Sequence, residues 1–301
     1  MSIRQAQDKQ QKIVPHLWYN TQAKEAAEFY ASVFPNSKVT NVSTLHDTPS
    51  GDADIVSFEV MGYKFMAISA GPLFKFNPSI SFHAKCRTAE EVDEIWEKLS
   101  PGGTVLMELG EYPFSKRYGW IQDKYGLSWQ VIYAQGDFEQ RITPVLMFTK
   151  DVCGKAEEAV NFYASVFPGA KTQVYARYAQ GEEPDKEGTV KYAQFIVEGQ
   201  EFGAMDSAQP HDFDFNEAVS LIVYCENQGE IDYYWEKLSA VPESEQCGWL
   251  KDKYGVSWQI VPTAMDEMMQ KGTPEQIARV TEAFLKMKKF DLEALQKAYE
   301  G

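Results

Sequence analysis

The sequence contains few cysteines, and they form no motif. Cys86, Cys153, Cys225 and Cys247 stand far apart, with no C-x-x-C pair among them. This spacing excludes a zinc knuckle and a thioredoxin-type redox motif. Isolated thiols in a chain of 301 residues are typical of a reducing compartment, so we expect a cytoplasmic protein.

Basic residues are also scarce. The chain has 29 Lys and Arg against 44 Asp and Glu, which gives a formal net charge of −15. No Lys/Arg-rich block is present to displace the counterions of nucleic acid or to attract anionic lipid. The polar N-terminal string MSIRQAQDKQQK lacks the apolar core of a signal peptide, and no apolar run reaches the length of a membrane span. We therefore expect no nucleic-acid partner and no membrane association.

The most informative feature of the sequence is a duplication. GWIQDKYGLSWQVIY at Gly119–Tyr133 returns as GWLKDKYGVSWQIVP at Gly248–Pro262, with nine of fifteen positions identical. FYASVFP and WEKLS each occur twice without change. Internal repeats of this kind indicate one structural unit written twice.

The repeats predict two equivalent domains and a unique extension, at residues 12–135, 141–262 and 263–301. Trp96 and Trp235 are 139 positions apart, whereas Trp129 and Trp258 are 129 apart. The second copy has therefore lost ten residues between these points (139 − 129). Loops tolerate such changes, so we expect one shortened hairpin there.

Hydrophobic periodicity predicts the order βαβββ followed by βαβββ within each copy. The four helices are expected at Thr21–Phe34, Thr88–Ser100, Lys155–Phe167 and Gln228–Ser239. Thr88 is expected as an N-cap, with Glu91 completing a capping box.

The extension reads as helical. Thr273 and Pro274 are typical of a helix start, and Asp291 is expected to cap a last helix. An apolar stripe follows helical spacing at Ile277, Val280, Phe284 and Leu285. We predict that this stripe packs on the chain's own domains or across a homodimer.

Paired βαβββ modules are the plan of the vicinal oxygen chelate superfamily, also called the glyoxalase/bleomycin resistance fold. The strings FYASVFP, FNPSISF, WEKLS and CGWLKDKYGVSWQIVP resemble its PhnB-like branch, which also carries the description 3-demethylubiquinone-9 3-methyltransferase-like. The string LKMKKFDLEALQKAY is similar to that branch as well. The resemblance covers residues 12–301 and implies an α+β fold with two tandem glyoxalase-like domains and a C-terminal helical tail.

The family description implies methyl transfer, which the residues do not support. Class I methyltransferases bind S-adenosylmethionine on a glycine-rich turn between a strand and a helix. The chain has no G-x-G-x-x-G motif, and Gly102 and Gly103 precede an expected strand. It also has no G-x-S-x-G nucleophile elbow. We therefore expect no methyltransferase activity.

In metal-using members of the superfamily, the ligands are typically His, His and Glu from the first strand of each module and the last strand of the domain. The resemblance puts other residues at these places, namely Pro15, Ser81 and Gln130 in the first copy and Pro144, Ser220 and Gln259 in the second. Proline offers no ligand atom, and neutral Ser and Gln oxygens bind transition metals weakly. We therefore expect no metal and no other cofactor.

Strand alternation places His83 on the inward face with Ser81 and turns His16 toward the helices. His83 has two open interpretations, a hydrogen-bonded pocket residue or a ligand and general base. Gln130 and Gln259 face inward, each as a structural lock or as a ligand contact. The predicted ligand-binding residues are Tyr19, His83, Tyr118 and Gln130 in the first copy and Gln259 in the second.

Two functions compete at this stage. The first is a metal-independent small-molecule binding protein whose ligand the sequence does not identify. The alternative is a glyoxalase-fold enzyme, either a metal-dependent lyase, isomerase or dioxygenase with non-standard ligands or a cofactor-free enzyme that uses His83. A purely structural role is the remaining alternative, and a homodimer is compatible with each of them.

Overall fold

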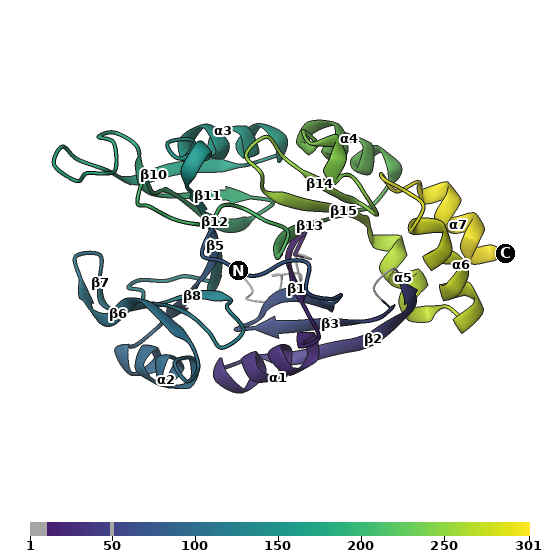
Figure 1. The fold of residues 1–301 in the computed structure, drawn as a ribbon, viewed down its shortest axis with the longest axis horizontal. Helices are drawn as coiled ribbons and strands as arrows, with labels where there is room; N and C mark the ends of the chain where they lie inside the picture. Colours follow the sequence, from purple (N-terminus) through teal and green to yellow (C-terminus); the bar gives the residue numbers. More distant parts are fainter. Residues whose placement is uncertain (1–10, 49–50) are drawn as a thin grey trace, which may run out of the picture.

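The structure is a computed structural model that describes residues 11–48 and 51–301, and its elements follow the predicted modules (Figure 1). The first copy contains β1 (Ile13–Tyr19), α1 (Ala23–Val33), β2 (Lys38–Thr48), β3 (Gly51–Val60), β4 (Tyr63–Ser69), β5 (Ile80–Cys86), α2 (Ala89–Leu99), β6 (Thr104–Tyr112), β7 (Ser115–Gln122) and β8 (Ser128–Tyr133). The second contains β9 (Ile142–Phe148), α3 (Ala156–Val166), β10 (Lys171–Arg177), β11 (Val190–Val197), β12 (Gln200–Asp206), β13 (Val219–Cys225), α4 (Gln228–Leu238), β14 (Trp249–Lys251) and β15 (Ser257–Pro262).

The four predicted helices are confirmed to within two residues at each end. The Thr88 hydroxyl accepts a hydrogen bond from the Glu91 amide at 3.1 Å, as expected of an N-cap. The predicted capping box is only half formed, because the Glu91 carboxylate accepts from the amide of Arg87 instead of that of Thr88. The predicted loss of ten residues is confirmed as a missing strand, since a single short strand, β14, stands where the first copy has β6 and β7.

The strands form two mixed sheets, and each sheet takes strands from both copies. The seven-stranded sheet has the order β14-β15-β13-β1-β4-β3-β2, and the eight-stranded sheet has the order β10-β11-β12-β9-β5-β8-β7-β6. The copies meet at two antiparallel pairs, β1 with β13 and β5 with β9. The first module of each copy therefore pairs with the second module of the other copy. The repeat pattern alone does not indicate this pairing.

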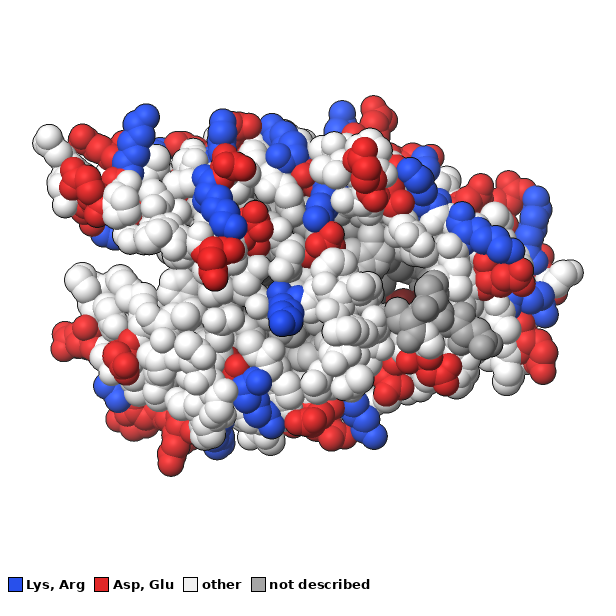
Figure 2. All heavy atoms as spheres, viewed as in Figure 1, with Lys and Arg blue, Asp and Glu red and all other residues white. Residues whose placement is uncertain are grey.

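Helices α1 to α4 cover the outer faces of the two curved sheets (Figure 1). One continuous apolar core lies under them and includes Tyr30, Trp129, Tyr163 and Trp258. Acidic and basic side chains alternate over the face drawn in Figure 2, without a continuous basic patch. Within the described residues, no helix is long and apolar enough to cross a membrane.

The C-terminal extension folds into α5 (Thr263–Lys271), α6 (Pro274–Phe284) and α7 (Leu292–Glu300) at one end of the molecule (Figure 1). Thr273 caps α6 in a complete capping box with Gln276, and Asp291 caps α7. Helix α5 was not predicted, because its start has no side-chain cap to mark it. The predicted stripe packs on the chain itself, since Val280 and Phe284 are buried in a cluster with Met268, Phe290 and Leu295.

Candidate functional site

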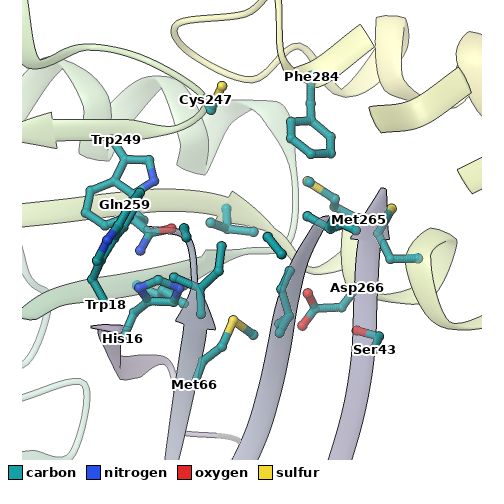
Figure 3. A pocket seen from close by; sticks show the side chains of 18 of the residues that line it. His16, Trp18, Ser43, Met66, Cys247, Trp249, Gln259, Met265, Asp266 and Phe284 are labelled. Atoms are coloured by element: carbon teal, nitrogen blue, oxygen red, sulfur yellow. The ribbon is translucent and has the colours of Figure 1, made fainter. Parts of the chain in front are cut away.

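The concave face of the seven-stranded sheet holds a cavity of about 830 Å³, which we call the capped cavity. Its walls come from both copies and from the C-terminal helices α5 and α6 (Figure 3). The lining is mainly apolar and aromatic, and polar side chains from different elements make up the rest. This combination is what a small-molecule site requires.

His16 on β1 lines the capped cavity, so the prediction that it faces the helices was wrong. His16 pairs with Ser220 across the β1–β13 boundary, and the neighbouring Pro15 pairs with the core residue Leu221. Pro15 therefore faces the helices, and His16 takes the inward place that the resemblance gave to Pro15. The reason for the error is the turn between β1 and α1, whose length fixes the strand parity and was not evident from sequence.

His16 is buried in the wall of the capped cavity, with 4% of its side chain exposed. Its ring meets that of Trp249 edge-on, at 5.6 Å between centroids. The Nδ1 atom is fully buried and has no hydrogen-bond partner among the described residues. Burial lowers the pKa of His16 to about 3, so the imidazole is neutral at pH 7.

Two further polar groups face the capped cavity from opposite sides (Figure 3). The amide nitrogen of Gln259 on β15 donates to the Ser220 hydroxyl at 2.9 Å, and its oxygen forms no hydrogen bond with a described residue. Asp266 on α5 accepts a hydrogen bond from the Tyr224 hydroxyl. Burial raises the pKa of Asp266 above its ordinary value, although this hydrogen bond acts in the other direction.

An aromatic wall closes one side of the capped cavity. The Trp18 ring meets Phe74 at 5.1 Å and Trp249 at 6.1 Å between centroids, both edge-on. The Trp18 indole donates to the carbonyl of Gly71 at 2.8 Å, which holds the ring in place. Such a wall offers both apolar surface and ring faces to a ligand.

The eight-stranded sheet brings three of the predicted residues together in a different arrangement. The Gln130 oxygen accepts from the Tyr118 hydroxyl and from His83 Nε2, each at 2.6 Å. Its nitrogen donates to the Ser81 hydroxyl at 2.7 Å. Because an amide oxygen only accepts, His83 must carry its proton on Nε2. The predicted polar face is thus a closed network, in which Gln130 has the geometry of a structural lock.

The two equivalent glutamines differ because their neighbours differ. The position equivalent to His83 in the second copy is Ile222, which has no hydrogen-bonding group and lines the capped cavity. The oxygen of Gln259 therefore accepts no hydrogen bond from a described residue, whereas that of Gln130 accepts two. Tyr19 lies in neither concave face, because its hydroxyl contacts that of Tyr30 at 3.0 Å on the helix side of the sheet.

No group of three His, Cys, Asp or Glu side chains comes together anywhere in the described ranges. In the capped cavity His16 lies beside the neutral oxygens of Ser220 and Gln259, a set that binds transition metals poorly. The expectation of a metal-free protein stays a prediction.

The buried histidines predict a loss of stability in mild acid. The unfolded chain protonates His16 below about pH 6.5, whereas the folded side chain does so only near pH 3. The unfolded state therefore binds more protons, and the unfolding free energy falls as pH decreases from 6.5, by about 1.4 kcal/mol per pH unit for this residue. Urea unfolding of His16→Phe between pH 7 and 5 should show a shallower decline than the unsubstituted protein.

Trp18→Phe serves as the control, because it alters the wall of the same cavity but removes no titratable group. It should leave the slope unchanged. An unchanged slope in His16→Phe would contradict this, because it would mean that His16 titrates in the folded protein as it does in the unfolded chain.

The fold and the site define the class of this protein. Two curved sheets of βαβββ modules, with helices over their outer faces, constitute the glyoxalase-like fold. Glyoxalase I from Zea mays shares it, with 13% identity over 86% of this chain and 97% of that chain and a TM-score of 0.55. A Bacillus subtilis protein provisionally described as a dioxygenase also shares it, with 11% identity over 82% of this chain and 84% of that chain and a TM-score of 0.52.

Within this class the family is specific. The family model described as 3-demethylubiquinone-9 3-methyltransferase matches residues 11–132 and again residues 140–261. The chain belongs to this family, the PhnB-like proteins. A Bacillus cereus PhnB protein, provisionally described by the same activity, is 38% identical over 41% of this chain and 100% of that chain, with a TM-score of 0.39. A comparison with curated proteins found no match.

Proposed function

We propose that this chain is a binding protein for a small apolar or aromatic molecule, which it takes into the capped cavity without a transition metal. The observation that carries the proposal is the cavity of about 830 Å³ with an aromatic wall and a mainly apolar lining. A volume of this size is typical of ligand sites. The Gln259 oxygen supports it further, because it belongs to the cavity lining and accepts no hydrogen bond from a described residue.

Binding of N-phenyl-1-naphthylamine, a neutral apolar fluorophore, tests this function. The probe should bind the unsubstituted protein with a rise in fluorescence, and dialysis against EDTA should not change its affinity. The variant Ile68→Trp places a large ring in the capped cavity and should weaken binding at least fivefold. Stoichiometric zinc, iron, manganese or nickel that survives dialysis would contradict the metal-free part of the proposal.

The chain offers a matched control for this variant. Ile68 and Met205 each lie six positions after an equivalent turn glycine, Gly62 and Gly199. Ile68 lines the capped cavity, whereas Met205 packs beside Tyr118 in the eight-stranded sheet. Met205→Trp should therefore bind the probe like the unsubstituted protein. Loss of binding in Met205→Trp alone would move the site to the eight-stranded sheet, where His83, Tyr118 and Gln130 were predicted to act.

A glyoxalase-fold enzyme is the second candidate, favoured by a single observation. The capped cavity contains both a neutral imidazole, His16, and a carboxyl with a raised pKa, Asp266. Groups with shifted pKa values in one cavity are typical of acid–base catalysis. Turnover of a bound compound that His16→Phe abolishes without weakening its binding would favour the enzyme. Methyl transfer, which the family description names, receives no support from the residues of either concave face.

A further inference from the structure

The capped cavity has an unusual charge balance. Among the residues that the structure describes, its lining includes the acidic residues Asp266 and Glu217 and the neutral His16, but no Lys or Arg. An anionic ligand would leave its charge buried among apolar groups without a cationic partner, which is costly. The cavity is therefore built for a neutral or positively charged ligand.

The two acids differ in their partners. Glu217 forms an ion pair with Lys251 at 2.7 Å, so its charge is already compensated. Asp266 forms no ion pair with a described residue, and its side-chain partner is the Tyr224 hydroxyl. Figure 3 shows the Asp266 carboxyl pointing into the capped cavity. A cation in the cavity would supply the missing counter-charge.

The opposite wall suits the rest of such a ligand. Trp18 and Trp249 lie across the cavity from Asp266 in Figure 3, together with the unoccupied Gln259 oxygen. Indole rings pack against apolar groups and attract cations more strongly than other side-chain rings do. A ligand with an apolar or aromatic body against this wall would extend toward Asp266.

From this arrangement we infer that the capped cavity binds an organic amine, with the ammonium group at Asp266 and the apolar body against Trp18 and Trp249. The inference rests on the proposed function and names the chemical class of its ligand. Recognition comes from a charge-assisted hydrogen bond to Asp266, apolar packing, and a hydrogen-bond acceptor at Gln259.

Calorimetric titration with three probes of similar shape tests the inference. The probes are 2-(2-naphthyl)ethylamine, 2-(2-naphthyl)ethanol and the carboxylate 2-naphthaleneacetate. The titrations are done at pH 8, where a primary ammonium is still charged, because alkyl amines titrate near ~10.4. The amine should bind at least tenfold more tightly than the alcohol, and the acetate should bind most weakly. Asp266→Asn keeps an acceptor for Tyr224 and should reduce the affinity for the amine about tenfold while changing that for the alcohol less than twofold.

Glu217→Gln is the control, because it removes an acid of the same cavity that is already paired. It should preserve the preference for the amine. Equal affinity for amine and alcohol in the unsubstituted protein, or a preference that survives in Asp266→Asn, overturns the inference and leaves the proposed function intact. If Asp266→Asn melts more than a few degrees lower, Asp266→Ser provides a second test with the same expected loss. Failure of all three naphthyl probes and of N-phenyl-1-naphthylamine to bind overturns both.

Discussion

Removal of residues 273–301 is expected to lower the melting temperature by roughly 6–12 °C and to abolish binding of N-phenyl-1-naphthylamine. The deleted helices bury Val280, Phe284, Phe290 and Leu295, and full burial of each such side chain contributes about 1.5–3 kcal/mol. Ordering the segment costs conformational entropy that offsets much of this. We expect a net loss of about 3 kcal/mol, from which the temperature shift follows.

The tail is bound to the second copy at the place where the hairpin was lost. The amides of Cys247 and Gly248 donate to the carbonyls of Met287 and Lys288 at 2.8 and 2.7 Å. Phe290 lies so close to Gly248 that a Cβ atom there would stand 2.5 Å from its ring. The tail thus covers the edge that the ten-residue deletion exposed, and it also walls the capped cavity.

Two point variants on α6 test the loss of stability and the loss of probe binding. Calorimetry measures the melting temperature, and light scattering reports association. Phe284→Ala, within the wall, should lower both the melting temperature and probe affinity. Glu282→Ala, on the exposed side of the same helix, should change neither. A truncated protein that stays monodisperse, equally stable and able to bind the probe would show that the tail is an independent appendage.

Much of the fold could be predicted because the chain repeats itself. The shared strings located the equivalent elements, and the change in offset at Trp235 located the missing strand. Local signals such as the caps at Thr273 and Asp291 act within a few residues and were therefore visible in the sequence. Pairing of modules between copies depends on which edges meet in space, and no local pattern encodes that.

The candidate site was predicted less well than the fold, because most of its residues come from segments that meet only in space. His83, Tyr118 and Gln130 were grouped correctly, because they lie on neighbouring strands of one module. The capped cavity combines His16 from the first copy, Gln259 from the second and Asp266 from the tail, which are brought together only by the cross-copy sheet. The one signal that pointed to it was the predicted inward position of Gln259, the equivalent of Gln130, whereas the inward histidine found only in the first copy favoured the other sheet.

Replacement of Asp252 should cause a large loss of stability. Its carboxylate is fully buried and accepts four hydrogen bonds. The donors are the Tyr163 hydroxyl at 2.8 Å, the Trp258 indole at 2.9 Å, and the amides of Tyr254 and Val256 at 2.9 and 3.1 Å. The string Asp-Lys-Tyr-Gly that begins at Asp252 is typical of a hairpin turn, which accounts for the two amides but not for the two side chains.

Asp252→Asn keeps the shape but turns one acceptor atom into a donor. Two of the four donors then lose their partner inside the core, and each buried donor left unsatisfied costs roughly 1–3 kcal/mol. The unfolding free energy should therefore fall by about 2–6 kcal/mol, a large fraction of the stability of a typical domain. Asp232→Asn, at an exposed site on α4, should produce no measurable change.

The duplication supplies an internal comparison. Asp123 accepts the equivalent bonds from Tyr30, Trp129, Tyr125 and Leu127, at 2.8 to 3.1 Å. Asp123→Asn should therefore cost about as much as Asp252→Asn.

Each of these networks joins a helix over one sheet to a turn of the other sheet, since Tyr163 lies on α3 and Asp252 precedes β15. Loss of either carboxylate should weaken both sheets together, because the apolar core between them is continuous. In urea, circular dichroism and tryptophan fluorescence should therefore report one coincident transition at a lower midpoint in both variants. Two separate transitions in Asp252→Asn would mean that the continuous core alone does not couple the two sheets and that the network is needed to hold them together.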